Sequence, residues 1–233
     1  TLDILCSFYA SDGKPLVSAP ENILRRAHDR FKADTGFIFK AMGELEYYVQ
    51  GKKEEMYPAE DQKGYHSAAP YSNYEGLRLE AMDLIASCGG KIKYGHCEVG
   101  SFSSDAESFE QHEIEFLPVE VEDAVDQLII AKWILRQLGD KYNVNLSFAP
   151  KITVGKAGSG LHVHMMLTKD GKNAMVENNK LSETAQKVIA GLLDLAAPLT
   201  AFGNTIPTSY LRLVPHQEAP TNICWGDRNR SVL

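Results

Sequence analysis

Two carboxylates stand at alternate positions inside an apolar segment of this sequence. Glu44 and Glu46 are separated by Leu45, and aromatic and aliphatic residues flank them on both sides. Because side chains alternate across a strand, both carboxylates point to the same face of a strand. Two like charges held this close repel each other unless a cation or an arginine lies between them. A solvated strand edge is the plain alternative, but the apolar flanks favour a metal site.

Two histidines repeat this spacing after a glycine-rich turn. The segment Gly158–His164 reads GSGLHVH, which places His162 and His164 on one face of a strand. The glycines allow the backbone to approach a ligand closely. Metal or phosphate binding and a structural role are both compatible with such a pair. A cupin-type iron or zinc site is a rival interpretation, but the glutamate that it needs soon after the histidines is absent.

Two further glutamates lie in strand-like segments. Glu98 ends one segment, and Gln111 and Glu113 begin the next. Each glutamate alone would be a surface residue, since exposed glutamate is the commonest kind. Together with Glu44 and Glu46 they form a hard, oxygen-rich set with few histidines. Such a set suits Mg²⁺ or Mn²⁺ rather than zinc.

Arginines cluster near the end of the chain. Arg212 and Glu218 belong to the run RLVPHQEAP, and Arg228 and Arg230 follow it. A planar guanidinium can bind a carboxylate or a phosphate through two parallel hydrogen bonds. Surface ion pairs are the alternative, but the two prolines make this run a poor helix face. Metal-binding glutamates and anion-binding arginines together indicate chemistry on a nucleoside triphosphate and an acidic substrate.

Hydrophobic periodicity predicts the elements that must position these residues. Apolar stripes predict helices that start near Pro20 and at about 77–88, 120–139 and 181–195. Alternating patterns predict strands at about 2–9, 37–49, 91–99, 110–117, 146–154 and 161–168. Strands that come in adjacent sets between helices favour an antiparallel α+β arrangement.

Local signals predict several boundaries. Ser18 and Glu21 have the spacing of a capping box, and Gly36 is expected to end the first helix. The polar stretch Gly51–Tyr71 is the longest loop candidate, either a lid or simple surface. The serine-rich stretch Gly100–Ser108 is expected to be an insertion beside the site.

The composition excludes several classes of protein. With 44% hydrophobic and 24% charged residues, the chain is typical of a globular protein. A net charge of −7 without a basic stripe argues against nucleic acid as a partner, and no apolar run is long enough for a membrane. The four cysteines form no CxxC pair, which predicts a reduced, cytoplasmic protein.

Read in order, these motifs resemble the catalytic domain of glutamine synthetases. The family has a Glu-x-Glu strand, a Glu followed by Gln-x-Glu, an Asn-Gly-Ser-Gly-x-His-x-His stretch, an Arg-Leu-Val-Pro-x-x-Glu-Ala-Pro stretch and an Asn-Arg-Ser. Here they are Glu44/Glu46, Glu98 with Gln111/Glu113, Gly158–His164, Arg212–Pro220 and Asn229–Ser231. The resemblance implies an α+β glutamine synthetase/guanido kinase-like domain, with a curved, mainly antiparallel sheet and flanking helices. It also implies that residues 1–233 are a single catalytic-domain fragment, cut at both ends, without the N-terminal β-domain.

The resemblance implies a role for each site residue. Glu46, Glu98 and Glu113 would hold a first metal ion, and Glu44 and His162 a second, both being Mg²⁺ or Mn²⁺. The two ions would support an ATP-dependent glutamate–ammonia ligase that works through a γ-glutamyl phosphate.

The remaining roles concern the substrates. Gly158 and Arg212 would hold glutamate, and His164 would lie beside the nucleotide. Glu218 would help to bind ammonium and accept its proton, and Arg230 would stabilise the transferring phosphoryl group. The family also implies a large, ring-shaped homo-oligomer.

Some positions depart from the family pattern. Ala157 stands where the family has Asn, Met166 replaces a Ser, and His216-Gln217 replaces Gly-Tyr. These changes leave two alternatives open. One is a γ-glutamyl ligase for another amine, and the other is a catalytically weak paralogue that binds metal or nucleotide. The fragment itself is expected to show little or no activity, because without the neighbouring N-terminal domain the active site stays open to water.

Overall fold

The computed structural model of the protein describes residues 2–217 and 219–227. Its helices are α1 (Pro20–Thr35), α2 (Glu75–Ser87), α3 (Val121–Lys141), α4 (Glu183–Asp194), α5 (Ala196–Gly203) and α6 (Pro207–Tyr210). Its strands are β1 (Ile38–Lys52), β2 (Ile92–Ser103), β3 (Glu107–Phe116), β4 (Val119–Glu120), β5 (Asn145–Ser147), β6 (Leu161–Lys169), β7 (Lys172–Asn173), β8 (Val176–Glu177) and β9 (Lys180–Leu181).

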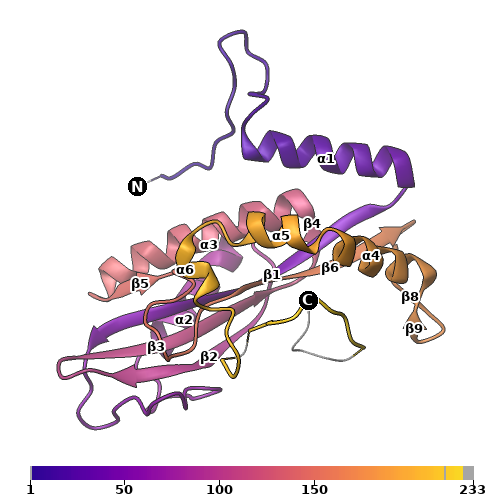
Figure 1. Cartoon of the computed structure of the whole chain (residues 1–233). Helices are drawn as coiled ribbons and strands as arrows, with labels where there is room; N and C mark the ends of the chain where they lie inside the picture. Colours follow the sequence, from indigo (N-terminus) through magenta and orange to yellow (C-terminus); the bar gives the residue numbers. More distant parts are fainter. Residues whose placement is uncertain (1, 218, 228–233) are drawn as a thin grey trace.

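β1 is the central strand of the larger sheet. The strands follow the order β2-β3-β1-β6-β7, and the short β4 and β5 also pair with β1. Every pairing is antiparallel. Figure 1 shows β1, β2 and β3 as long neighbouring strands, with α3 lying along the sheet. The predicted α+β arrangement with a curled antiparallel sheet and flanking helices is confirmed.

The hydrophobic core lies on one face of this sheet. Leu45 and Tyr47 of β1 are at most 1% exposed and share the core with Ile114 of β3. Helices α2 and α3 cover them with Leu77, Ala81, Ile85, Ala131, Leu135 and Leu138. Because side chains alternate along β1, burying Leu45 turns Glu44 and Glu46 toward the opposite face. The core therefore determines which face carries the carboxylates.

A small deletion in this core is expected to lower stability measurably. Ile114 is fully buried, so Ile114→Val should lower the free energy of unfolding by about 1 kcal/mol. Ile129 on α3 is 47% exposed, and Ile129→Val is expected to cost less than about 0.5 kcal/mol. Urea unfolding of both variants measures the difference. Equal losses would show that β3 does not pack against the helices as described.

The four predicted helices are present as α1 to α4, with two changes at their ends. Pro20 opens α1 and Gly36 ends it in the left-handed conformation, as expected. The predicted capping box is wrong, because Ala19 is the N-cap residue and Glu21 accepts the backbone N–H of Phe8 instead.

Gly139, expected at the end of the third helix, lies inside α3, which continues to Lys141. A Cβ atom at Gly139 would lie 3.1 Å from the carbonyl oxygen of Val144. The glycine therefore allows the chain that leads into β5 to pass close to α3.

Two of the predicted strands are wrong in whole or in part. Residues 2–9 form no strand, and an isolated bridge between Tyr9 and Pro15 is their one described pairing. Leu2 and Ile4 are 84% and 71% exposed, so the apolar pattern there has no sheet to join within the described residues. The strand predicted at 146–154 is the short β5, which ends at Ser147.

The stretch Gly100–Ser108 is not an inserted loop. β2 continues to Ser103 and β3 begins at Glu107, with Ser103 paired with Ser108. The register shifts between Cys97 and Ser101, which marks a bulge or irregularity in β2. The stretch therefore lengthens a hairpin, because Ser101, Phe102 and Ser103 pair with Glu110, Phe109 and Ser108.

The loop predicted at 51–71 is bound to the edge of the sheet. The backbone N–H groups of Gln62, Gly64 and His66 donate to the carbonyls of Ser101, Val99 and Cys97 at 2.7, 3.2 and 2.9 Å. These alternating bonds extend the sheet beyond β2. Of the two expectations for this loop, surface and lid, the bonding favours an ordered surface segment.

Within the described residues, no single helix is long and apolar enough to cross a membrane. Helices α4 and α5, which meet at a bend, are long and apolar enough only when they are taken together.

Candidate metal and substrate site

The register of four strands brings the predicted acidic residues together. β1 pairs with β3 so that Glu46 lies opposite Glu113, and with β6 so that Glu44 lies opposite His162. β2 pairs with β3 so that His96 lies opposite Glu113. Directly opposed residues share a face of the sheet. Residues far apart in the sequence therefore meet on the face that the core leaves free.

Glu44 lies between the two predicted histidines. Its carboxylate oxygens lie 2.9 Å from Nδ1 of His162 and 2.6 Å from Nε2 of His164. These hydrogen bonds hold the pKa of Glu44 well below its usual range, and they raise the pKa values of both histidines. Nε2 of His162 accepts a hydrogen bond from Arg212 at 3.0 Å. Glu44, His162, His164 and Arg212 thus form one polar cluster.

Glu46 is buried and supports the glycine-rich turn. One of its oxygens accepts the backbone N–H of Gly160 at 2.8 Å and the side-chain amide of Gln111 at 2.9 Å. Its other oxygen lies 3.8 Å from Nε2 of His162. Burial raises the pKa of the Glu46 carboxyl. Glu46 therefore joins the histidine cluster to the turn before β6 and keeps one oxygen for another partner.

Glu113 lies where two groupings of donor atoms meet. One donor atom from each of His96, Glu98 and Glu113 lies within 4.8 Å of the other two. The same is true of Glu44, Glu113 and Glu115. Burial, reinforced by the neighbouring carboxylates, raises the pKa of Glu113 to about 7. A hard divalent cation would relieve this crowding, so the donor set fits Mg²⁺ or Mn²⁺.

The turn before β6 is held by side chains of β1, of β3 and of the segment 51–71. The hydroxyl of Tyr48 donates to the carbonyl of Ala157 at 2.8 Å, and the N–H of Ala157 donates to Gln62 at 2.7 Å. Gln111 donates to the carbonyl of Gly158 at 2.9 Å. A Cβ atom at Gly158 would overlap the carbonyl oxygen of Pro150. This turn is therefore fixed in position, and it requires glycine at 158.

Comparison with known proteins agrees with this geometry. The family model for the glutamine synthetase catalytic domain matches residues 17–233. The chain belongs to the glutamine synthetase family. Glutamine synthetases of Thermus thermophilus and Pyrococcus furiosus are each 34% identical to it, over 99% and 97% of this chain. The chain covers 51% and 50% of those two proteins, so it spans about half the length of the curated relatives it matches.

Solved structures show the same fold. The cryo-EM structure of Plasmodium falciparum glutamine synthetase matches with a TM-score of 0.83 at 22% identity, over 97% of this chain and 50% of that one. A crystal structure of a glutamine synthase homolog matches with a TM-score of 0.78 at 22% identity, over 97% and 51%. The predicted glutamine synthetase-like fold is thereby confirmed.

The predicted site residues of this glutamine synthetase family member divide into three groups. Those on the sheet lie on its free face as two neighbouring clusters, around Glu44 and around Glu113, and they comprise Glu44, Glu46, Glu98, Glu113, His162 and His164. Gly158 and Arg212 border the first cluster: a Cβ atom at Gly158 would lie 2.8 Å from Cγ of Arg212. Glu218 and Arg230 lie outside the described residues.

The sequence did not single out three residues that complete this site, namely His96, Tyr48 and Gln62, although it did point to Gln111. His96 lies beside Glu98 and Glu113, and Tyr48, Gln62 and Gln111 hold the turn before β6. His96 precedes Glu98 at the same alternate spacing as Glu44 and Glu46, which was an available signal. Tyr48 and Gln62 carry no such signal, because their roles depend on contacts with a distant loop.

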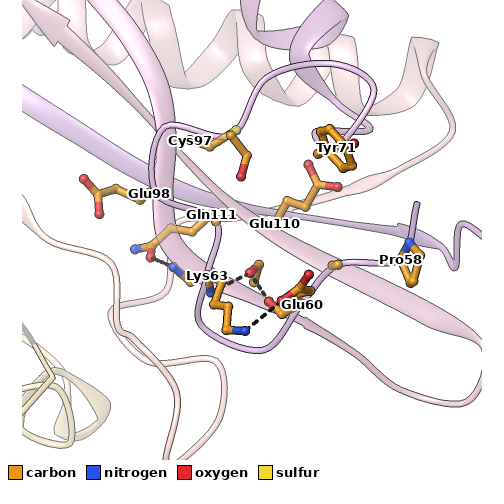
Figure 2. A pocket seen from close by; sticks show the side chains of 13 residues that line it. Pro58, Glu60, Lys63, Tyr71, Cys97, Glu98, Glu110 and Gln111 are labelled. Carbon is orange, nitrogen blue, oxygen red and sulfur yellow. Dashed lines mark hydrogen bonds and ion pairs between the residues drawn. The ribbon is translucent and has the colours of Figure 1, made fainter.

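A cavity of about 240 Å³ lies next to this site, under the segment 58–71. Figure 2 shows Glu60, Lys63, Glu110 and Gln111 around it, with the ion pair between Glu60 and Lys63. Glu98 and Gln111 belong to both the cavity wall and the site. The cavity therefore borders the face of the sheet that carries Glu98.

Mn²⁺ affinity is expected to rise as the pH is raised from 6 to 8. A carboxyl group must lose its proton to bind a metal, and burial raises the pKa of Glu113 to about 7. Below that pH the proton competes with the metal, so affinity should fall about tenfold per pH unit. Calorimetric titration with Mn²⁺ at three pH values measures this slope. An affinity independent of pH would contradict the buried position of Glu113.

Proposed function

We propose that the protein is a glutamate–ammonia ligase that makes glutamine through a γ-glutamyl phosphate, with ATP and Mg²⁺ or Mn²⁺. The observation that carries the proposal is the strand register that sets Glu46 opposite Glu113 and Glu44 opposite His162 on one face. Membership of the glutamine synthetase family supports the reaction class.

The metal roles come from the family resemblance, and the two clusters support them. Glu46, Glu98 and Glu113 would hold the first ion, and Glu44 and His162 the second. When bound, the ions neutralise charge on the phosphate oxygens of ATP. The residues of this chain keep the carboxylates in place by hydrogen bonds, of which the Gln111 amide on Glu46 is an example.

The substrate roles fall on the rim of the same face. Gly158 lies in the fixed turn and presents its backbone, and the guanidinium of Arg212 is suited to the carboxylate of glutamate. His164, whose side chain is half-exposed, would contact the nucleotide. Glu218 would take the proton from ammonium, and Arg230 would stabilise the transferring phosphoryl group.

Another residue brings a side-chain amide to the turn at Ala157, where the family has Asn. The amide of Gln62 reaches the N–H of Ala157, so an amide group lies at this turn although it comes from another segment. The curated relatives named above are glutamine synthetases, which supports ammonia rather than another amine as the acceptor.

The wider setting is proposed by family likeness. Residues 1–233 would be a single piece of the catalytic domain, and the whole protein a large homo-oligomer of ring symmetry in the cytoplasm. Its partners would then be the small molecules glutamate, ammonia and ATP.

Phosphate release by the full-length protein tests the proposal. Release from ATP should require glutamate and ammonia together, and methylamine in place of ammonia should give less. Phosphate release with an amine but none with ammonia would favour the other ligase. If calorimetry detects no ATP binding in the presence of Mg²⁺, both enzyme interpretations fail.

A further inference from the structure

His96 lies beside two of the predicted metal ligands, Glu98 and Glu113. It lies on β2 directly opposite Glu113, and its side chain is buried. Nε2 of His96 is 3.2 Å from a carboxylate oxygen of Glu113, and Nδ1 is 3.9 Å from Glu98. One imidazole therefore lies against both carboxylates.

The ring of His96 is held in one orientation. His66 stacks on it with ring centroids 4.4 Å apart and an interplanar angle of 9°, and Tyr94 stacks at 5.4 Å and 22°. Nδ1 lies 2.9 Å from the carbonyl oxygen of Cys97. A carbonyl oxygen can only accept, so Nδ1 carries a hydrogen. When the ring is neutral, Nε2 is therefore the nitrogen that can bind a metal, and it lies against Glu113.

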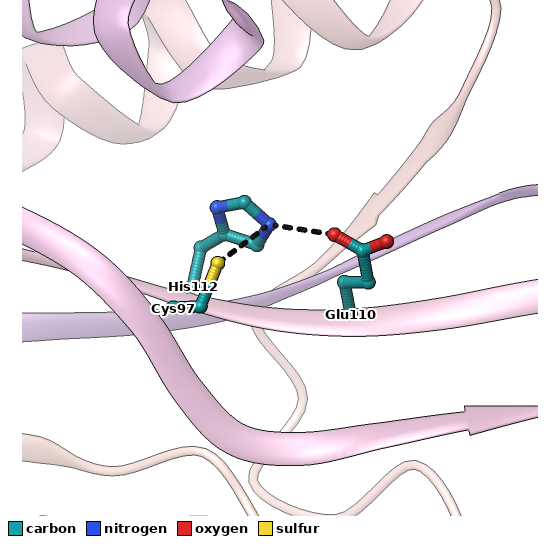
Figure 3. Close-up of side chains that lie close together, drawn as sticks. All are labelled: Cys97, Glu110 and His112. Atoms are coloured by element: carbon teal, nitrogen blue, oxygen red, sulfur yellow. Dashed lines mark hydrogen bonds and ion pairs between the residues drawn. The ribbon is translucent and has the colours of Figure 1, made fainter. Parts of the chain in front are cut away.

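The hydrogen bonds of His96 differ from those of His112, the buried histidine on the other face of the sheet. Figure 3 shows Cys97, Glu110 and His112 close together, a grouping with the residue types of a metal site. Arg78, which has no acceptor, donates to Nδ1 of His112 at 2.7 Å. Nε2 of neutral His112 must then carry the hydrogen, and it has no lone pair for a metal.

The hydrogen-bond partners of His28 argue in the same way against a metal site at His28, Glu120 and Glu122. The N–H of Phe39 donates to Nε2 of His28, so Nδ1 of His28 carries the hydrogen and donates to Glu122 at 2.8 Å. Among the three histidine-containing groupings of the described residues, the one at His96 leaves Nε2 available to a metal when the ring is neutral.

We propose that Nε2 of His96 is a ligand of the first metal ion, together with Glu98 and Glu113. This inference rests on the proposed function, which places a metal there. Two ligands bound at about 2.1 Å lie roughly 3.0–3.4 Å apart for angles between octahedral and tetrahedral. The 3.2 Å between Nε2 and Glu113 falls in that range. The carbonyl behind Nδ1 orients the ring as outer partners of metal-bound histidines do.

A nitrogen ligand changes which ion the site prefers. Mg²⁺ favours an all-oxygen set, whereas first-row transition ions accept imidazole readily. With His96 as a ligand, the first site should therefore favour Mn²⁺ over Mg²⁺ by more than its carboxylates alone would. Glu46 keeps its place, because one of its oxygens is still free of N–H donors.

Metal titrations of the full-length protein test the proposal. His96→Gln is expected to weaken Mn²⁺ binding by about tenfold or more and Mg²⁺ binding by much less. The matched control is His66→Phe, which keeps a flat ring on His96 and should leave both affinities unchanged. Equal losses for Mn²⁺ and Mg²⁺ in His96→Gln would overturn the proposal.

Pulsed electron paramagnetic resonance gives a second measurement that needs no change at His96. In a His162→Asn background, Mn²⁺ at the first site should show coupling to a histidine nitrogen, and ¹⁵N-labelling of histidine should alter it. Absence of that coupling would overturn the proposal.

A separate variant distinguishes this inference from the proposed function. If Glu113→Ala loses Mn²⁺ binding but His96→Gln keeps it, the metal site stands and the role of His96 is wrong. If Glu113→Ala binds Mn²⁺ like the unchanged protein, the proposed metal site itself fails.

Discussion

Glu113→Ala is expected to lower Mn²⁺ affinity by about 100-fold or more, since changes even to outer partners of a metal cost about 10–100-fold. Glu113 is 4% exposed and belongs to both acidic groupings on the free face of the sheet. Glu46→Ala should have a comparable effect. Calorimetry with Mn²⁺ on the full-length protein measures the loss.

The matched control for this result is Glu120→Ala. Glu120 is the N-cap residue of α3, and its half-exposed carboxylate pairs with Lys32 at 3.4 Å. Its removal should leave Mn²⁺ affinity unchanged. Equal effects of Glu113→Ala and Glu120→Ala would mean that the glutamates of the sheet are ordinary surface residues.

Gly158→Ala should lower kcat/KM for glutamate by about 100-fold, since a misplacement of about 1 Å can have that effect. The new Cβ atom would overlap the carbonyl oxygen of Pro150 and lie 2.8 Å from Cγ of Arg212. A backbone carbonyl cannot turn aside as a long side chain can. The turn must therefore move, and the guanidinium of Arg212 with it.

Gly191→Ala is the matched control for the change at Gly158. Gly191 lies in α4, where an added Cβ atom meets nothing within 4 Å. Alanine there should leave kcat/KM unchanged and slightly stabilise the helix. A Gly158→Ala variant with normal kinetics would show that the turn is not a rigid part of the glutamate site.

The hydrophobic pattern predicted helices and strands correctly where it was long and where another layer of the fold packs against it. The stripe of α3 and the alternation of β1 are confirmed, because each buries its apolar side against a neighbouring layer. The stretch 2–9 shows the limit of this reasoning. Its apolar residues resemble a strand, but a strand needs a partner edge, and the pattern contains no information about partners.

The sequence by itself determined the local geometry of the candidate site. Glu44 and Glu46 share a strand face because alternation is a property of the extended chain, and the same holds for His162 and His164. The glycine at 158 was also visible, although the carbonyl of Pro150 that requires it was not.

Only the tertiary structure decided which histidine faces the metal ligands. Register across β2, β3 and β1 sets His96 and Glu46 on either side of Glu113, and it depends on hydrogen bonds between residues far apart in the chain. His96 and His112 differ in the partner of Nδ1, a carbonyl in one case and Arg78 in the other. That partner decides where the lone pair of the ring lies, and no spacing in the sequence specifies it.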